Sequence, residues 1–278
     1  PRSTLSSSSA ASDVYKRQQQ VERPADQQTI VKRFTDASID VVNRHQETDN
    51  PFFIYLAYNL PHVPLFASED FMGTSKRGLY GDVVEEIDYN IGRLIAALKE
   101  KGLDKNTVII FAADNGYYMG NRGFAGKWTH YDESLRVPLI LFDPRRSTKD
   151  AVNTSNKTVL NIDIAATILD IAGVSIPQIY QGKSLLPILN NEEVEPWREH
   201  FLIEHRMEHD KLPKYVGIHE ERYVYVNYYE QKPPYEYLHD LQKDPNQLIN
   251  LKNDPHYLAI LKEMRGKCER LESNIKNN

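Results

Sequence analysis

The stretch NTVIIFAADNG (residues 106–116) carries an apolar run directly into an acid, an amide and a glycine. Residues 107–113 have the composition of a buried strand, and Asp114 and Asn115 follow it without a spacer. A turn accounts for the amide and the glycine, because Asn-Gly favours turn conformations. Carboxylate and amide oxygens are also ligands of hard cations, so the dipeptide by itself favours a turn and a metal site about equally.

The segments on either side alternate between two kinds of apolar pattern. Helical spacing predicts helices from about Thr29, from Gly81 to a stop at Gly102, and over 162–172. Continuous apolar runs predict buried strands over 52–58, 107–113 and 137–142. Such alternation is typical of an α/β fold with a parallel-rich sheet and flanking helices, in which ligands bind at the carboxyl ends of strands. Asp114, Asn115 and His62 all follow such an end.

Past Pro187 the pattern changes to short aromatic and β-branched runs separated by turns. These runs predict a smaller C-terminal α+β subdomain with an antiparallel sheet, closed by an amphipathic helix over about 255–275. The tyrosines of 222–237 favour aromatic packing within this sheet over stacking on sugar rings. Cys268, the single cysteine, lies among charged residues and is predicted to face solvent from the closing helix.

The composition excludes several classes of partner. A net charge of -5 provides no basic field for nucleic acid, and no apolar run approaches the ~20 residues that span a bilayer. Residues 1–28 are rich in Ser, Ala and Gln and lack the apolar stretch of a signal peptide, so we expect a disordered or non-native tail. A core domain over 29–190 and a subdomain over 191–278 follow it.

Two further residues have side chains suited to chemistry. Lys127 lies in the glycine-bearing segment GFAGKWTHYDES (123–134), and His62 lies between two prolines in NLPHVPL (59–65). Taken singly, each favours a structural interpretation: a solvated surface lysine, and a histidine that packs in a stiff loop. Their combination with Asp114 and Asn115 is more informative than any one of them.

Five separated segments of the chain keep a recognisable order and spacing. They are PFFIYLAYNLPHVPL (51–65), YGDVVEEIDYNIGRLIAALKEKGLDKNTVIIFAADNG (80–116), GKWTHYDESLRVPLI (126–140), NIDIAATILDIAGVSIPQIYQGKSLLPIL (161–189) and YEYLHDLQKDPNQLINL (235–251). Together they closely resemble the C-terminal half of the type I sulfatases of the alkaline phosphatase superfamily, over about residues 29–275. The resemblance implies a partial alkaline-phosphatase-like sheet and a parent enzyme that hydrolyses sulfate esters of sulfated carbohydrates. By family habit, that enzyme is secreted, periplasmic or lysosomal.

The resemblance also implies a role for each residue singled out above. The ADNG segment matches a metal motif of the family, which makes Asp114 and Asn115 ligands of a Ca²⁺ (or Mg²⁺) that holds the sulfate oxygens. Lys127 matches the lysine that contacts the sulfate, and His62 matches a histidine near the leaving oxygen, a proton donor. These roles suit the reaction, because sulfate-ester cleavage collects negative charge on the sulfate and leaving oxygens.

Two family features are missing from the sequence. Relatives carry an aspartate pair for the same metal and a Cys (or Ser)-x-Pro-x-Arg motif whose first residue becomes the formylglycine nucleophile; neither occurs here. We therefore expect the chain to be the C-terminal portion of a sulfatase, inactive alone, with the formylglycine in the missing N-terminal part. Arg122 stands where many relatives have histidine, which leaves the substrate contact at that position open.

Two alternatives to the sulfatase interpretation stay open on the sequence. A phosphate or phosphonate monoester hydrolase of the same superfamily shares the metal-binding frame, although the segments around His62 and Lys127 favour the sulfatase. A truncated, non-catalytic relative that binds carbohydrate belongs to a different class of function.

Overall fold

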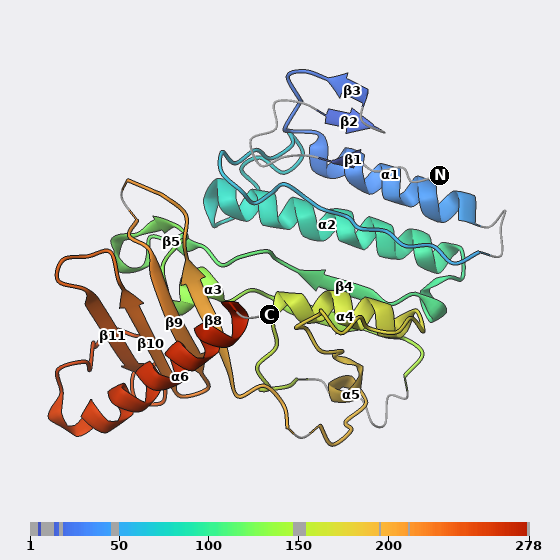
Figure 1. The fold of residues 1–278 in the computed structure, drawn as a ribbon. Coiled ribbons are helices and arrows are strands. Elements are labelled where there is room, and N and C mark those ends of the chain that lie inside the picture. The colour runs from blue at the N-terminus through green and yellow to red at the C-terminus, as the bar shows by residue number, and fades with distance from the viewer. Residues whose placement is uncertain are drawn as a thin grey trace. The chain divides into compact units, whose positions relative to one another are not determined.

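The computed structural model describes residues 5–6, 14–16, 19–45, 50–146, 154–194, 196–210 and 212–276. The chain divides into two compact units (Figure 1), and each is described by itself. The first unit comprises Pro1–Val108 with Asp143–Arg145, and the second comprises Ile109–Phe142 with Arg146–Asn278.

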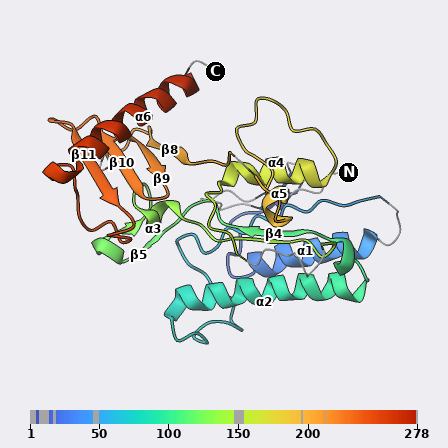
Figure 2. The ribbon, with the colours of Figure 1, turned by 90° about the horizontal axis from the view of Figure 1, so that it is seen from below.

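Two long helices, α1 (Ile30–His45) and α2 (Gly78–Glu100), pack against each other in the first unit (Figure 2). Both were predicted from their apolar spacing. The core between them and the adjoining loops consists of Val31, Leu60, Ala67, Val83 and Ile87. The predicted stop of α2 is confirmed: Gly102 has φ 68° and donates to the carbonyl of Lys99 at 3.0 Å, before the 3-10 turn η1 (Asp104–Asn106).

Two acidic side chains of α2 hold the long loop that precedes this helix. Asp82 accepts hydrogen bonds from the backbone N–H groups of Gly73 at 2.9 Å and Ser75 at 2.8 Å. Both bonds lower the pKa of the Asp82 carboxyl below its usual range, and the bond from Gly73 has the larger effect. Glu86 accepts from the backbone N–H of Ser68 at 2.9 Å. The loop therefore has fixed partners although it contains no helix or strand.

Residues 52–58 correct one prediction. They belong to no strand within the described part of the chain. Leu56 and Tyr58 pack against the α1 residues of one core cluster, whereas Phe53 and Tyr55 are 70% and 83% exposed. The assignment of a fully buried strand is wrong, because apolar content alone does not supply the hydrogen-bonded neighbour that a sheet requires.

Three short strands lie within the segment predicted to be a tail. They are β1 (Leu5–Ser6), β2 (Val14–Lys16) and β3 (Gln19–Glu22), paired antiparallel in that order. The composition gave no indication of them, because ladder hydrogen bonds are made by the backbone and place little demand on Ser and Gln side chains. The remaining residues of 1–18 lie outside the described part.

The second unit holds the other helices and strands that the structure describes. Its helices are α3 (Asp132–Leu135), α4 (Asn161–Ile171), α5 (Leu186–Leu189) and α6 (Leu258–Lys276), with 3-10 turns η2 (Asn121–Gly123) and η3 (Pro255–Tyr257). Its strands are β4 (Ile109–Ala112), β5 (Tyr118–Met119), β6 (Ala125–Gly126), β7 (Leu139–Phe142), β8 (His200–His205), β9 (Tyr215–Glu220), β10 (Tyr223–Tyr228) and β11 (Tyr235–Asp240). The predicted boundary near residue 190 falls between α5 and β8, inside this unit, and stays a prediction.

The strand that opens this unit pairs in an unexpected direction. β4 runs antiparallel to β7, with Ile109 opposite Phe142 and Ala112 opposite Leu139. A parallel pair needs a crossover of a dozen or more residues, usually a helix. The connection here contains only the β5–β6 hairpin, η2 and the single turn of α3. The α/β architecture is confirmed, and the β4–β7 pair is antiparallel in a sheet that the sequence predicted to be rich in parallel pairs.

A buried acid fixes the start of α4. Asp163 is 0% exposed and accepts from the backbone N–H groups of Leu160 at 2.7 Å and Lys183 at 2.8 Å. Arg198 donates to both carboxylate oxygens, at 2.7 and 2.8 Å. One carboxylate thus joins the helix start, the turn before α5 and the connector that leads to β8.

The C-terminal part is the antiparallel sheet and closing helix that the sequence predicted (Figure 1). The strand order is β11-β10-β9-β8, and α6 packs on one face. The core beneath α6 consists of Val216, Ile218, Tyr225, Leu238, Tyr257, Leu261, Met264 and Cys268. The opposite face carries Ile203, Tyr215, Val224, Val226 and Tyr228, and Leu135 of α3 packs against it. Tyrosines are present in both cores, as the preference for aromatic packing predicted.

Cys268 corrects the prediction of a solvent-facing thiol. Its exposed fraction is 3%, and burial raises the pKa of the thiol to about 12. The residue follows Leu261 and Met264 at helical spacing on the inner face of α6. Of the charged neighbours that suggested exposure, Glu269 and Arg270 are exposed, whereas Arg265 and Lys267 are half-buried and form ion pairs with the sheet. Among the described residues, no helix is long and apolar enough to cross a bilayer.

Removal of the Asp163 carboxylate should destabilise the fold strongly. We expect Asp163→Ala to lower the free energy of unfolding by about 3–5 kcal/mol, because the guanidinium of Arg198 would stay buried without a counter-charge. Urea unfolding followed by circular dichroism measures this. Glu204→Ala, which removes the exposed partner of Arg206, serves as the control and should cost no more than about 1 kcal/mol. Equal losses in the two variants would contradict the structural role of Asp163.

Candidate functional site

Asp114, two residues past the end of β4, is held by a contact from α4. The backbone carbonyl of Asp114 accepts from the side chain of Asn161, the first residue of α4, at 2.9 Å. The carboxylate of Asp114 accepts the backbone N–H of Asn115 at 2.9 Å. Asp114 itself is exposed and Asn115 is half-buried. The strand end therefore presents a carboxylate and an amide on a restrained backbone.

Gly116 packs this strand end against α3. Its backbone N–H donates to the carbonyl of Ser134 at 3.0 Å. A Cβ at this position would lie 2.3 Å from the carbonyl oxygen of Glu133, a distance that side chains do not tolerate. Glycine is thus required by close approach of two backbones, in addition to any preference for a turn.

Lys127 reaches the same strand end from the β5–β6 hairpin. Tyr118 is opposite Gly126 in this hairpin, and Lys127 follows directly. Its ammonium donates to Oδ1 of Asn115 at 2.7 Å. The structure therefore brings Asp114, Asn115 and Lys127 together at one end of β4. Their chemical roles stay predictions.

Trp128, next to the lysine, adopts an uncommon backbone conformation. Its φ is 92°, in the left-handed region that a bulky side chain rarely occupies. The backbone N–H donates to Oγ of Ser134 at 2.9 Å, and the hydroxyls of Tyr118 and Thr129 share a hydrogen bond of 2.5 Å just beyond it. Such strain persists only where the surrounding contacts determine the backbone, and it is concentrated at functional sites.

The residues at the strand end satisfy part of a metal site. Carboxylate and amide oxygens suit Ca²⁺ and Mg²⁺, but Ca²⁺ takes about 6–8 oxygen ligands. Within the described residues, no group of three or more His, Cys, Asp or Glu side chains is placed to hold an ion. The ammonium of Lys127 also bonds the amide oxygen of Asn115. The donor chemistry fits a hard cation, and the ligand count requires further donors.

His62 belongs to the first unit and is described there by itself. The side chain is exposed, and its ring Nδ1 donates to the carbonyl of Val63 at 2.6 Å. An exposed ring contributes little to packing. Because Nδ1 has an acceptor, Nε2 is the atom left for a ligand, and it can release a proton only from the doubly protonated imidazolium.

Arg122 has a structural explanation. Its side chain is 12% exposed, and Nε donates to Glu133 at 3.1 Å. The guanidinium lies 4.0 Å from the ring centre of Tyr131 and donates to the carbonyls of Asn246 and Gln247. These contacts hold the loop after β11 against α3. The arginine is therefore committed to the protein, in place of the substrate contact left open by the sequence.

His130, three residues after Lys127, forms a buried pair with His239 that no sequence motif predicted. Nε2 of His130 and Nε2 of His239 lie 3.2 Å apart. Nδ1 of His130 is 2.9 Å from the hydroxyl of Tyr228, and Nδ1 of His239 donates to the carbonyl of Ile249 at 2.9 Å. The segment three residues past Lys127 is thereby tied to strands β10 and β11.

These histidines are held uncharged by their surroundings. Burial lowers the pKa of His130 well below its usual range, and the positive charge of a protonated His239 would lower it further. Burial likewise lowers the pKa of His239 and of His205, a β8 residue that is 6% exposed. All three must gain protons for the chain to unfold in acid.

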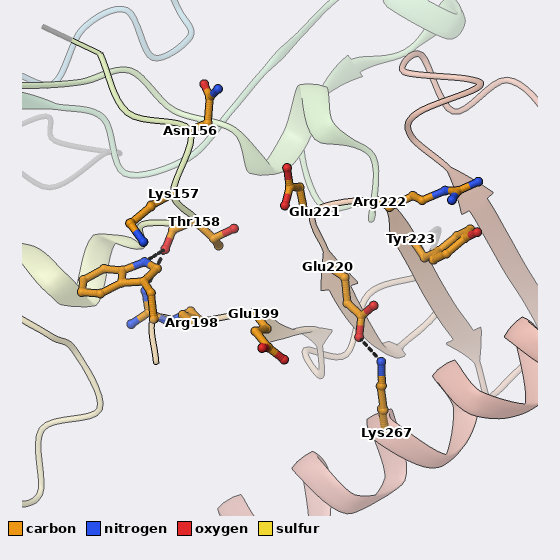
Figure 3. Close-up of a pocket in the computed structure, with 11 residues that line it drawn as sticks. Asn156, Lys157, Thr158, Arg198, Glu199, Glu220, Glu221, Arg222, Tyr223 and Lys267 are labelled. Carbon is orange, nitrogen blue, oxygen red and sulfur yellow. Dashed lines mark hydrogen bonds and ion pairs between the residues drawn. The ribbon is translucent and has the colours of Figure 1, made fainter. Parts of the chain in front are cut away.

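A cavity of about 540 Å³ lies elsewhere in the second unit (Figure 3). Its lining residues are Asn156, Lys157, Thr158, Trp197, Arg198, Glu199, Glu220, Glu221, Arg222, Tyr223 and Lys267. Lys267 donates to Glu220 at 2.8 Å, and the indole of Trp197 donates to the carbonyl of Thr158 at 2.8 Å. The cations of this cavity are engaged by protein groups, and none of the predicted site residues lines it.

Comparisons with known proteins show which proteins this sequence is similar to. A family model for the sulfatases matches residues 3–174, and a model described as N-sulphoglucosamine sulphohydrolase, C-terminal, matches residues 120–274. N-acetylgalactosamine-6-sulfatase of Mus musculus is 31% identical over 180 residues, which are 61% of this chain and 34% of that protein. Steryl-sulfatase of Homo sapiens is 32% identical over 187 residues, 62% of this chain and 31% of that protein. The chain spans about a third of the length of these relatives.

Solved structures agree with the family models. BT4656, solved in complex with its substrate D-glucosamine-2-N,6-O-disulfate, is 29% identical with a TM-score of 0.66, over 72% of this chain and 41% of that one. A phosphonate monoester hydrolase from Silicibacter pomeroyi is 22% identical with a TM-score of 0.75, over 92% of this chain and 61% of that one. At that identity the second likeness concerns the fold.

The buried histidines predict that stability falls in acid. The unfolded chain binds protons at imidazoles near pH ~6.5, whereas the folded chain holds their pKa lower, so stability is complete above that pH and decreases below it. The loss approaches about 1.4 kcal/mol per pH unit for each imidazole. Urea unfolding between about pH 7.5 and about pH 5.5 measures it. His130→Gln should reduce the slope, and a slope equal to that of the unsubstituted chain would contradict the assignment.

Proposed function

Because the chain belongs to the sulfatase family, a family of sulfuric ester hydrolases, we propose that it forms the metal- and sulfate-binding side of such an enzyme's active site. The observation that carries the proposal is the contact of 2.7 Å between Nζ of Lys127 and Oδ1 of Asn115. The contact joins an ammonium to an amide oxygen near the end of a strand, and α/β proteins bind ligands at the ends of strands.

Asp114 and Asn115 would hold a Ca²⁺ or Mg²⁺ ion. Their oxygens supply two ligands, so the other donors come from substrate, water or residues outside this sequence. When bound, such an ion acts as a Lewis acid toward the sulfate oxygens. The side-chain hydrogen bond from Asn161 to the Asp114 carbonyl supports the proposal, because it orients the residue that carries the carboxylate.

Lys127 would bind the sulfate and stabilise charge on the leaving oxygen. Its ammonium has three donors, and Asn115 takes one of them. The others are available to an anion. The loop that carries it is held by the hydrogen bond from Trp128 to Ser134 and by the buried His130. A cation preorganised in this way needs little reorganisation when charge develops.

His62 would protonate the leaving oxygen. The bond from Nδ1 to the Val63 carbonyl orients the ring and leaves the Nε2 proton of the imidazolium for transfer. We place the formylglycine nucleophile outside these 278 residues, which contain no Cys (or Ser)-x-Pro-x-Arg motif. A phosphonate monoester hydrolase has a similar fold. No feature of the described site favours phosphonate monoester hydrolysis over sulfate-ester hydrolysis.

Loss of the Lys127 ammonium should affect catalysis far more than folding. In an active enzyme that contains this chain, we expect Lys127→Ala to lower kcat/KM for sulfate esters by about 10²–10³-fold, because one preorganised charge contact in the transition state is removed. Thermal unfolding should change little. Lys105→Ala, at an exposed lysine of η1, is the control and should alter neither quantity. Full activity in Lys127→Ala would refute the proposed sulfate contact.

The leaving group distinguishes a catalytic from a structural His62. We expect His62→Ala to slow sugar or alkyl sulfates more than nitrophenyl sulfates, because an alkoxide requires protonation as it departs and a nitrophenolate requires little. The ratio of kcat/KM for the two substrate types measures this, with the unfolding temperature recorded in parallel. An equal loss on both substrates would remove His62 from the proposed mechanism.

A further inference from the structure

The hydrogen bonds around His130 and His239 can run in one direction only. Burial keeps both imidazoles neutral, so each ring has one donor and one acceptor nitrogen. Nδ1 of His239 lies 2.9 Å from the carbonyl of Ile249, and a carbonyl accepts but does not donate. His239 therefore carries its proton on Nδ1 and accepts at Nε2. His130, whose Nε2 lies 3.2 Å from that acceptor, must donate from Nε2.

Tyr228 supplies the first donor of this series. With its proton on Nε2, His130 accepts at Nδ1, which lies 2.9 Å from the hydroxyl of Tyr228. Burial raises the pKa of Tyr228, so the hydroxyl keeps its proton and can donate it. The hydrogen bonds thus run from Tyr228 through His130 and His239 to the carbonyl of Ile249, and every ring nitrogen has a partner. We call these four groups the histidine bridge.

The histidine bridge holds the end of the lysine loop, residues 127–130. His130 is 1% exposed, and the two residues between it and Lys127 are held by hydrogen bonds to Ser134 and Tyr118. Those two hydrogen bonds stay within the segment between β4 and β7. The bridge joins the same segment to β10, to β11 and to the loop after β11.

The two imidazoles provide a fixed orientation that apolar side chains would not. A buried polar group destabilises the fold unless each of its atoms has a partner, so apolar residues would fill this space at less risk. The rings of Tyr131 and Tyr237, with centres 4.0 and 4.7 Å from that of His130, confine the plane of its imidazole. The hydrogen bonds at its two nitrogens then fix the rotation within that plane, because such bonds are directional.

We propose that His130 and His239 are positioning residues for Lys127: the histidine bridge fixes the end of the lysine loop and thereby holds the ammonium at Oδ1 of Asn115, 2.7 Å away. A lysine side chain is long and flexible, so its ammonium is located only as well as the backbone that carries it. The inference rests on the proposed function, in which Lys127 binds the sulfate, and adds two residues that act through the lysine.

The tautomers of the two histidines test the bridge in the 278-residue chain itself. We expect long-range proton–nitrogen NMR correlations at neutral pH to show the Nε2–H tautomer for His130 and the Nδ1–H tautomer for His239. Spectra of His130→Gln and His239→Gln assign the signals. The opposite tautomer at either residue breaks the series of donors and overturns the inference.

Two matched tyrosine variants of β10 test the effect on catalysis. In an active enzyme that contains this chain, Tyr228→Phe removes the first donor of the bridge. It should lower kcat/KM for a sulfate ester by about tenfold, since a displacement of about 1 Å can slow a reaction by about 100-fold. The control, Tyr225→Phe, removes a buried hydroxyl that bonds Glu236 at 2.6 Å in the core beneath α6, and should change kcat/KM less than about twofold. Equal losses in the two variants would contradict the positioning role.

A double-mutant cycle separates positioning from folding. His130→Phe should lower kcat/KM by about tenfold or more in the parent enzyme, but by less than about twofold once Lys127 is replaced by alanine. His130→Gln, which keeps a donor toward His239, should retain more activity than His130→Phe. Unfolding temperatures are recorded in parallel, so that every rate is measured on folded enzyme.

The outcomes of the cycle distinguish this inference from the proposed function. If Lys127→Ala loses activity while His130→Phe keeps it, or if His130→Phe costs the same factor with and without Lys127, the positioning role is refuted and the proposed function stands. If Lys127→Ala is fully active, the proposed function fails and the inference fails with it.

Discussion

Asp163 accepts four hydrogen bonds at full burial: two from backbone N–H groups and two from the guanidinium of Arg198. A buried carboxylate is costly unless every such bond is made, so the segments that supply the donors have little freedom to move apart. They are the start of α4, the turn before α5 and the connector to β8. The start of α4 in turn holds Asp114 through Asn161. The position of Asp114 therefore depends on the buried charge of Asp163, which lies outside the proposed site.

The segment between β4 and β7 shows how the second unit builds a site without a long helix. The close approach of Gly116 to Glu133, the hydrogen bond from Trp128 to Ser134, and the burial of His130 each fix one point along it. Lys127 lies between these fixed points. The flexible side chain of Lys127 therefore extends from a backbone that is held on both sides. The strained φ belongs to the next residue, Trp128.

Apolar spacing predicted the longer helices α1, α2, α4 and α6, because one buried face of a helix leaves a periodic pattern in the sequence. It could not predict the direction of the β4–β7 pair, which depends on the connection and not on the strands. It also could not show that residues 52–58 have no ladder neighbour among the described residues, because an unpaired apolar segment and a paired strand have the same composition. The sulfatase resemblance is confirmed by the family models.

The sequence predicted which residues belong to the candidate site, but it predicted only part of their arrangement in space. Asp114, Asn115 and Lys127 were selected from the resemblance, and the structure brings them together. His130 and His239 escaped notice because they are 109 residues apart and belong to no motif. Arg122 was open to either interpretation until its partners were seen, since a guanidinium that binds substrate and one that ties two loops look alike in sequence.

The single thiol of the chain has a consequence for how its motions can be observed. Cys268 faces the sheet from α6, so a thiol reagent reaches it only when that helix lifts from the strands. Intact molecules therefore stay unlabelled, and the labelling rate in native buffer reports how often the closing helix opens. The chain thus carries an internal reporter of subglobal opening in its C-terminal part, without any engineered cysteine.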